Sequence, residues 1–527
     1  MSGWHFPHPT PRMTHVDPPG GSALPRESRT GLPAWNHGEL PAPHRRTWRD
    51  LLGPGIVMAG ASLGAGEWLL GPAITARYGG ALLWITVLTL LAQYIYNVEA
   101  SRYTLFTGES IMTGKLRLKP GSRFWTVTYA VVDFWSMLPY QLAGVAVTLA
   151  AVLLGRIPNP ATETELMRTL TYVVLILFPI PLIFGGTIYR MVKALVMVKV
   201  FYVLGFTLLV ACFLASWSDV REVLLGFLSF GSVPAADGTV VNVFSQLAKG
   251  ESLPELDGPS LQLVTALAAI AGVGGLTQST ICAYIREQGW GMGGKVGAIP
   301  SAVRGLDLEL AHTGTVFTPT PSALERWRGW LRMVRLDQWL VWIPASLIGL
   351  ALPALISLAV VPRGTVADRW VLAGMMAEGA STRVGGIIGD LLWHGMLLCG
   401  FLIFFPVVIT TVDGFLRRWV DITWTSFGRF QKLDPQRVKW IYYGFLVAYL
   451  VMAGAFLSFA NPLWLVIVSA NVANVALGLS CLHTLAVNVR LLPPPLRPSW
   501  PSRIALGLSG VYFLSMAGLT LSIALRG

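Results

Sequence analysis

Apolar runs of about 20 residues recur along this chain from position 51 to position 525, and eleven of them can be counted. A run of this length crosses the hydrocarbon core of a bilayer as one helix. Only 13% of the 527 residues are charged and 54% are hydrophobic, which leaves too little polar surface to cover a water-soluble globule. The sequence therefore predicts an all-α, multi-pass protein of the cell membrane, surrounded by the lipid bilayer.

The expected membrane-spanning helices form two sets of five, with one helix left over. We expect a tail at 1–46, a core at 47–490 and an eleventh helix at 503–525. Within the core, one set covers about 51–216 and the other about 262–487. The individual spans expected are 51–79, 81–106, 124–155, 168–189, 192–216, 262–285, 336–360, 386–416, 438–458, 462–487 and 503–525.

The tail at 1–46 is rich in Pro, Gly and Arg and has no hydrophobic period, so we expect it to be disordered. No apolar core of a signal peptide precedes position 51, and we expect the first span to direct insertion. Five of the eight histidines lie in this tail, namely His5, His8, His15, His37 and His44. Because these histidines are irregularly spaced, a solvated tail is favoured over a cluster of metal ligands.

Basic residues predict the orientation of the chain, because they gather in cytoplasmic loops. They flank the first span at 45–49 and fill the loops after the second, sixth and eighth spans. The segment 217–260 is acidic instead, with six Asp or Glu residues against Arg221 and Lys249. This alternation places the N-terminus in the cytoplasm and the C-terminus outside.

Charge and cysteine usage exclude other kinds of partner. Lys plus Arg number 39 and Asp plus Glu 27, but the resulting net charge of +12 follows the loop pattern, so no nucleic-acid partner is expected. The four cysteines lie singly inside apolar runs, without the spacing of a thiolate metal site or a disulfide framework. We expect no cofactor and a monomeric protein.

Two of the spans contain glycine-rich interruptions near their middle. The first reads Gly64-Ala65-Gly66-Glu67, and the second runs from Ala271 through three glycines to Thr277-Gln278-Ser279-Thr280. Each lies in the first helix of its set of five, and paired breaks of this kind point to a substrate site at the membrane midplane of an inverted-repeat transporter. Close helix packing is the alternative for the glycines, and a position near the outer surface is the alternative for Glu67.

The sequence resembles the Nramp (natural resistance-associated macrophage protein) family of divalent-metal transporters. The resemblance begins at Gly53-Pro54-Gly55 and is strongest in the second span, at Gln93, Ala100-Ser101-Arg102-Tyr103 and Thr107-Gly108-Glu109. It continues through Gly144 and covers roughly 50–490. It implies a leucine-transporter-like fold of two inverted five-helix repeats and a divalent cation as substrate.

The usual metal-site motifs of that family are missing, which indicates a divergent branch. Asp-Pro-Gly-Asn of the family is replaced by Gly64 to Glu67, and Met-Pro-His aligns with Gly275-Leu276-Thr277. The remaining oxygen donors suit Mg²⁺ better than softer ions, and the chain resembles a magnesium-transporting branch in this respect. We expect Glu67 as the principal charged ligand, within a metal site formed by Glu67, Gly64, Gly272, Gly275, Thr277 and Gln278.

Further polar residues in the spans carry secondary hypotheses. Asn471 and Asn474 lie on one face of the tenth span, which flanks the binding site in the family, so we expect them as secondary contacts. Leu138 and Gln141 align with acidic positions of the family and cannot carry protons, whereas Asp133 is either a displaced proton carrier or a structural carboxylate. Two pairs at helical spacing, Glu99 with Arg102 and Asp413 with Arg417, are expected to form structural or gating salt bridges. For Asp390 and His394 we expect a hydrogen-bonded pair, with metal entry as the alternative.

The function that these residues predict is import of a divalent cation, Mg²⁺ or a Mn²⁺ or Fe²⁺ type ion, by alternating access. The alternative keeps the fold and changes the substrate to a small organic solute such as an amino acid or an amine, whose ammonium group pairs with Glu67. A sensor without transport is a third class. An enzyme is not expected, because no catalytic or nucleotide-binding motif occurs in a suitable context.

Overall fold

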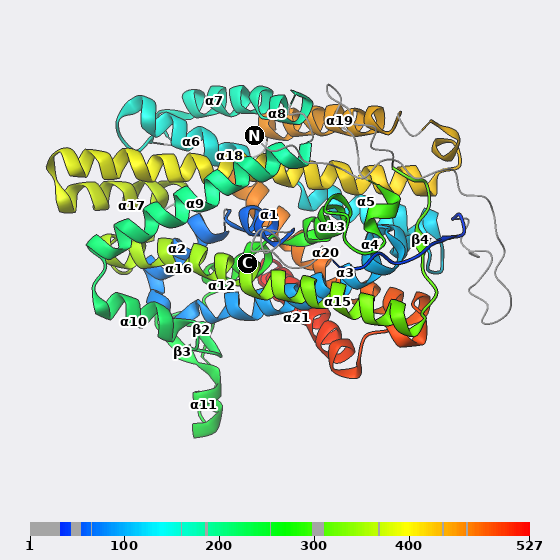
Figure 1. Ribbon diagram of the computed structural model, residues 1–527. Coiled ribbons are helices and arrows are strands. Elements are labelled where there is room, and N and C mark those ends of the chain that lie inside the picture. The colour runs from blue at the N-terminus through cyan, green and yellow to red at the C-terminus, as the bar shows by residue number, and fades with distance from the viewer. Residues whose placement is uncertain are drawn as a thin grey trace.

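The computed structural model describes residues 32–43, 54–64, 66–159, 161–184, 188–252, 254–297, 310–366, 369–434, 437–459 and 462–526. These residues form an elongated helical bundle with two small two-stranded sheets (Figure 1). Within them, nine helices are long and apolar enough to cross a membrane, or ten when one bent pair is counted as a span. The chain is a multi-span membrane protein.

The first expected span does not form one helix, which is why length and composition give fewer than eleven. It is divided into α1 (Pro54–Ser62), the π-helical turn η2 (Gly66–Leu70) and α2 (Gly71–Tyr78). The segment Gly66–Leu82 then meets the next helix at 95°. The remaining helices of the first half are η3 (Gly79–Leu82), α3 (Trp84–Thr107), α4 (Ile111–Leu116), α5 (Ser122–Ser136), α6 (Tyr140–Leu154), α7 (Thr164–Leu177), α8 (Pro179–Phe184) and α9 (Ile188–Leu214).

The second half repeats this plan, beginning with another interrupted helix. Its first span consists of α12 (Gly258–Ile270), the 3₁₀ turn η4 (Gly275–Thr280) and α13 (Ile281–Glu287). The remaining helices are α14 (Gly293–Val296), α15 (Pro321–Asp337), η5 (Gln338–Trp342), α16 (Ile343–Val360), α17 (Arg369–Val384), α18 (Gly386–Ser426), η6 (Phe430–Lys432), α19 (Val438–Phe459), α20 (Pro462–Leu491), η8 (Pro494–Leu496) and α21 (Trp500–Arg526).

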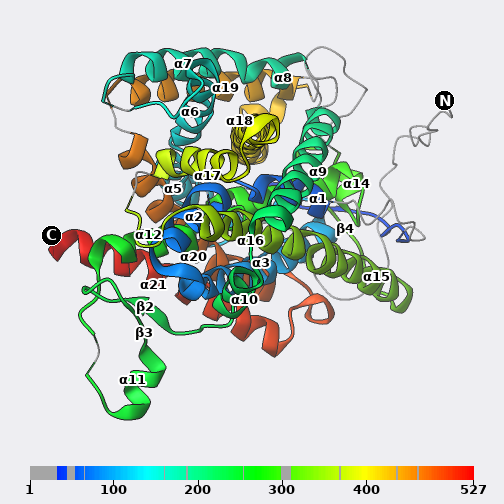
Figure 2. The ribbon, with the colours of Figure 1, turned by 90° about the vertical axis from the view of Figure 1, so that its left-hand side faces the viewer.

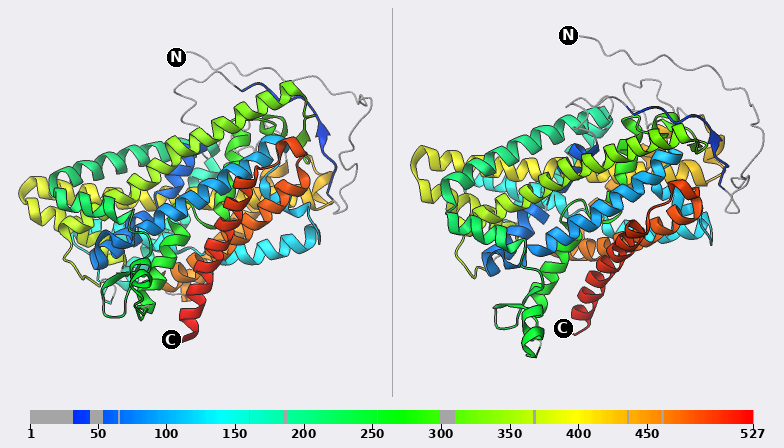
Figure 3. Two further views of the ribbon diagram at one scale, coloured as in Figure 1. Left: turned by 90° about the horizontal axis from the view of Figure 1, so that it is seen from below. Right: turned by 60° about the horizontal axis from the view of Figure 1, so that its bottom comes forward.

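The loops gather at two opposite ends of the bundle (Figures 2 and 3). At one end, strand β1 (Asn36–His37) pairs in parallel with β4 (Thr315–Val316). At the other end, the acidic segment forms α10 (Trp217–Gly226), the hairpin of β2 (Ser232–Pro234) and β3 (Val240–Asn242), and α11 (Val243–Lys249). The end of α21 lies beside the start of α12, since a Cβ added at Gly258 would meet Ile523 at 3.2 Å. Strand β1 and the end of α21 therefore lie at opposite ends of the bundle, and which end faces the cytoplasm stays a prediction.

The end of the N-terminal tail is ordered, so the prediction of disorder up to residue 46 is wrong for 32–43. Besides the β1–β4 pairing, Leu32 and Leu40 are buried, and Arg117 Nη1 donates a hydrogen bond to Pro33 O at 2.8 Å. The Pro-rich and Gly-rich sequence of the tail gives no sign of these contacts, because the contacts are made with distant loops and need no periodic pattern in the tail itself. Residues 1–31 and 44–53 lie outside the described residues.

Large apolar side chains remain exposed on the outer helices. Phe213 of α9, Val451 of α19 and Leu508 of α21 are each more than half exposed. Such side chains would be unfavourable against water, whereas the hydrocarbon of a bilayer accommodates them.

Candidate functional site

The first break separates α1 from η2 and frees backbone groups of both. In a continuous helix the Gly64 amide would donate to Gly60 O, but here it donates to Glu67 Oε2 at 3.0 Å. The Gly60 carbonyl instead accepts a hydrogen bond from Lys199 Nζ of α9 at 2.8 Å, and Leu63 O accepts another from the same atom. A carboxylate and an ammonium thus serve the two kinds of backbone group that the break exposes.

The second break, between α12 and η4, is built from glycines with positive φ. The φ angles of Gly272, Gly274 and Gly275 are 79°, 69° and 53°, a region that L side chains rarely adopt. Gln93 of α3 spans this break, with its Nε2 donating to Ala271 O at 2.8 Å and its Oε1 accepting from Val273 N at 3.3 Å. The neutral amide of Gln93 therefore bonds Ala271 O and Val273 N of this break.

Glu67 joins the two breaks. Its Oε1 accepts a hydrogen bond from Gly272 N at 2.9 Å, while its Oε2 accepts from Gly64 N, and the side chain is only 2% exposed. The two backbones approach closely at this point, since a Cβ added at Gly66 would lie 2.7 Å from Ile270 O. Glu67 is accordingly a buried brace between the interrupted helices.

A cavity of about 50 Å³ lies between the two breaks. This is room for several water molecules at roughly 10–15 Å³ each, or for a solute of few atoms. Its lining is neutral, and consists of Ala61, Gly64, Ser136, Met137, Leu138, Tyr140, Gln141, Ile270, Gly272, Val273, Gly274, Gly275, Thr277, Val407, Thr411, Tyr449, Ser469 and Ala473.

Four of the expected metal-site residues line this cavity and two do not. Gly64, Gly272, Gly275 and Thr277 face it, whereas Glu67 bonds to the backbone beside it. Gln278 points elsewhere, donating from Nε2 to Asn97 Oδ1 at 2.8 Å. Across the described part of the chain, no three His, Cys, Asp or Glu side chains lie close enough to hold a metal ion together.

The asparagines of α20 are beside the cavity without lining it. α20 contributes Ser469 and Ala473 to the wall. Asn471 Nδ2 donates to Ile467 O of its own helix, and Asn474 Nδ2 donates to Thr265 O of α12 at 3.1 Å. Asn474 thus links α20 to α12, whereas Asn471 bonds within α20, and their expected part as secondary contacts to a substrate stays a prediction.

Asp133 is bonded to a neighbouring helix just beyond the cavity. Its two oxygens accept from Arg418 Nε and Nη2, both at 2.8 Å, and from Trp419 Nε1 at 2.8 Å. Arg418 Nη1 also donates to Leu276 O at 3.0 Å. This is the geometry of the structural carboxylate, and a part in proton transfer stays a prediction.

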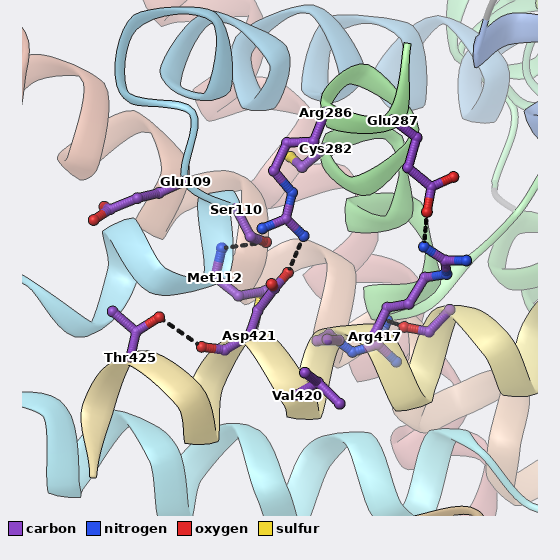
Figure 4. Close-up of polar contacts among 12 residues, drawn as sticks. Glu109, Ser110, Met112, Cys282, Arg286, Glu287, Arg417, Val420, Asp421 and Thr425 are labelled. Carbon is purple, nitrogen blue, oxygen red and sulfur yellow. Dashed lines mark hydrogen bonds and ion pairs between the residues drawn. The ribbon is translucent and has the colours of Figure 1, made fainter. Parts of the chain in front are cut away.

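Further ion pairs link α13 to α18 toward the β1–β4 end (Figure 4). Arg286 pairs with Asp421 at 2.6 Å, and Arg417 pairs with Glu287 and, at 2.7 Å, with Asp413. All of these side chains are buried. The expected pairing of Asp413 with Arg417 is therefore present, and it belongs to a network that closes this end of the bundle.

The other two expected pairs differ from each other. Glu99 and Arg102 form a two-pronged ion pair at 2.8 and 3.1 Å, and Arg102 Nη1 also donates to Leu496 O of η8. His394 Nδ1 instead lies 2.8 Å from the main-chain oxygen of Asp390, and its ring does not pair with the carboxylate. The Glu99–Arg102 pair therefore ties α3 to the chain between α20 and α21, and a gating part stays a prediction.

A buried ion pair in the loop after α3 anchors the same end. Burial alone would raise the pKa of Glu109, but the Arg117 guanidinium and hydrogen bonds from Arg117 and Tyr103 hold that pKa below its ordinary value. Glu109 also accepts from Gly314 N at 3.0 Å, next to β4. The motif Thr107-Gly108-Glu109, which is part of the family resemblance, thus helps to hold this loop in place through Glu109.

Sequence reasoning missed Lys199 and most of the cavity wall. The signal for Lys199 was that it is the one charged residue in the apolar stretch 194–214, since a charge inside a membrane span indicates a functional position. Tyr140, Thr411 and Tyr449 had no such signal, because hydroxyl-bearing side chains are common in membrane helices and only the fold brings these three to one wall.

Comparisons with known proteins identify the fold. No protein-family model matches the chain, and no curated protein matches it significantly. Among solved structures, a mutant of the Eremococcus coleocola manganese transporter is similar with a TM-score of 0.57 and 14% identity, covering 93% of this chain and 97% of that one. The same transporter in complex with an aromatic bis-isothiourea substituted compound gives a TM-score of 0.55 and 13% identity over the same shares. The chain accordingly has the leucine-transporter-like fold, with two inverted five-helix repeats and an eleventh helix.

Proposed function

We propose that the protein is a secondary transporter that works by alternating access, with its substrate bound in the cavity between the two helix breaks. The supporting observation is that the cavity lies where the interrupted helices of the two repeats meet, which is where carriers of this architecture bind their substrates. The buried ion pairs of α5, α13 and α18 close one end of the bundle. In this mechanism they must separate when that end opens.

A divalent cation of the Mg²⁺ or Mn²⁺ type is one candidate substrate. The likeness to a manganese transporter and the oxygen donors of Ser136, Thr277 and Thr411 support it. However, both oxygens of Glu67 already accept backbone hydrogen bonds. A doubly charged ion would therefore enter a wall without a free carboxylate, and losing its hydration there is unfavourable.

A small organic solute such as an amino acid or an amine is the candidate that the geometry favours. The observation that carries this choice is the neutral cavity wall, whose hydroxyl and amide groups both donate and accept hydrogen bonds. Such groups can pair with an amino group and a carboxyl group in turn, and a solute of zero net charge needs no counter-ion. The cavity volume limits the solute to few non-hydrogen atoms.

The test is flux into proteoliposomes, with Mn²⁺ and Mg²⁺ entry measured beside counterflow of labelled small amino acids and amines. We expect counterflow of an organic solute that Thr277→Val lowers at least tenfold, whereas the control Thr382→Val, at an exposed position of α17, leaves it unchanged. Divalent-cation flux without organic-solute counterflow would overturn the organic substrate and support the cation. Binding without any flux would overturn transport itself and favour a sensor.

A further inference from the structure

The helix that begins with α15 is much longer than a membrane span. α15, η5 and α16 form one helical stretch of 40 residues, from Pro321 to Val360. At 1.5 Å per residue this stretch is about 60 Å long, whereas the hydrocarbon core of a bilayer is about 30 Å thick. All of its charged residues lie in α15, and none lies between Gln338 and Val360. The edge of the hydrocarbon therefore falls near the end of α15.

Three arginines of α15 share one exposed face, which continues into the membrane-spanning part of the helix. Arg328, Arg332 and Arg335 are four and three residues apart, and Trp339 follows four residues later. The three arginines are exposed, and Trp339 and Leu340 are 51% and 54% exposed. Because large apolar side chains at this level face lipid, the arginines of the next two turns face the headgroup layer of the same leaflet.

The neighbouring helix α3 supplies a second aromatic side chain at this level. α15 packs against α3 on the side of the bundle that faces the viewer in Figure 1. The rings of Tyr94 of α3 and Trp339 meet edge to face with their centroids 5.5 Å apart, and Arg335 is close enough to act electrostatically on Tyr94. Tyrosine and tryptophan prefer the interface between hydrocarbon and headgroups. Arg335 thus lies beside an aromatic pair at that interface.

The protein does not neutralise these arginines with its own acidic groups. Within the described part of the chain, no carboxylate oxygen lies within 4.0 Å of Arg328, Arg332 or Arg335. The buried arginines of the same end are paired, as Arg286 with Asp421 shows. A guanidinium binds a phosphate through two parallel N–H···O bonds, and basic side chains next to a membrane span attract anionic headgroups. The exposed face is therefore complementary in charge to an acidic lipid.

We propose that Arg328, Arg332 and Arg335 form a binding site for the phosphate of an acidic phospholipid, with Tyr94 and Trp339 against the upper part of its acyl chains. These three arginines are called the α15 arginine stripe. Its positive charge selects lipids of net negative charge, such as phosphatidylglycerol, over zwitterionic phosphatidylcholine. The stripe lies on the outside of the bundle, so this proposal does not depend on transport through the cavity.

The experiment measures thermal unfolding of the purified protein in detergent micelles that contain either dioleoylphosphatidylglycerol or dioleoylphosphatidylcholine. We expect phosphatidylglycerol to raise the wild-type Tm by about 3 °C or more above its value in phosphatidylcholine. Replacing the three stripe arginines with glutamine should remove about two-thirds or more of that difference. The control variant replaces Arg429, Lys432 and Arg437 with glutamine, which removes the same charge from exposed positions between α18 and α19, and it should keep the difference.

Three results would overturn the proposal. One is a wild-type protein that is equally stable in the two lipids, and another is an equal loss of the lipid effect in the two triple variants, since net charge alone would explain it. The third is equal stabilisation by inorganic phosphate, which would make the ligand a free anion. If the stripe variant fails to fold, a photoreactive phosphatidylglycerol decides with the wild type. Labelling of the peptides that contain Tyr94 and Trp339 would support the site, and labelling of neither peptide would overturn it.

Discussion

Both helix breaks leave backbone amides and carbonyls without helical partners, and different side chains bond to those groups at each break. At the first break, charged side chains serve the exposed backbone, since Lys199 donates to its carbonyls and Glu67 accepts from the Gly64 amide. At the second, neutral Gln93 serves Ala271 O and Val273 N, and positive-φ glycines hold the shape. The difference teaches that charge in this site is concentrated on one repeat, whereas the other repeat depends on backbone conformation.

This asymmetry also explains why the cavity wall is neutral. The negative charge of Glu67 is directed at two amides, one from each break, and the positive charge of Lys199 is directed at three carbonyls. Both charges hold helices in place, and neither is presented to the cavity. Substitutions that affect one break and not the other can therefore test whether charge and conformation are truly divided in this way.

The largest effect is expected from Glu67→Ala, because Glu67 accepts a hydrogen bond from one backbone amide of each break. Its loss leaves two buried amides without acceptors and Lys199 without its nearby counter-charge, which should cost about 3–5 kcal/mol of unfolding free energy. Glu67→Gln keeps one acceptor oxygen and should cost about 1–3 kcal/mol. Denaturant titration in detergent measures both, with exposed Glu165→Ala as the control. Equal losses of unfolding free energy in Glu67→Ala and Glu67→Gln would contradict the proposal that hydrogen bonds accepted by Glu67 hold the two breaks together.

The next effect tests how strongly each break requires glycine, by placing the same methyl group at each break. Gly274→Ala puts a side chain on a residue with φ of 69°, with its Cβ 2.5 Å from Ala269 O, and should cost about 2–3 kcal/mol. At Gly64 the nearest atom to an added Cβ is 3.7 Å away and φ is not positive, so Gly64→Ala should cost under about 1 kcal/mol. The difference in denaturation midpoint decides, and a larger loss at Gly64 would mean that the first break also depends on glycine conformation.

Sequence patterns predicted the existence of both breaks better than the contacts within them. Hydrophobic runs marked the spans, and glycines with one misplaced carboxylate marked the interruptions, because both signals are local. The bonds that Glu67 makes to Gly64 and Gly272 depend on two segments about 200 positions apart, and no local pattern contains them.

Long-range pairing also explains why α18 extends to Ser426 and not to the expected 416, since Arg417 and Arg418 are neutralised by carboxylates of other helices. α17 was not expected, because Arg369–Val384 is less apolar than the spans around it.

The smallest effect is expected from changing the side chain that serves the second break. Gln93→Leu removes one donor and one acceptor of neutral character, and should cost about 1–2 kcal/mol. Gln93→Glu keeps an acceptor for Val273 N but leaves Ala271 O without its donor and adds a second buried carboxylate. The ammonium group of Lys199 already donates to carbonyls of the first break and of α18, so the new carboxylate has no cationic partner. The Glu variant should therefore be less stable than the Leu variant at neutral pH.

The loss of unfolding free energy in Gln93→Glu should shrink as pH falls and the carboxylate is protonated, whereas the loss in Gln93→Leu should not change with pH. Unfolding midpoints of both variants measured from pH 8 to pH 5 test this, and a Glu variant that matches wild type at pH 8 would show that the second break accepts charge as readily as the first.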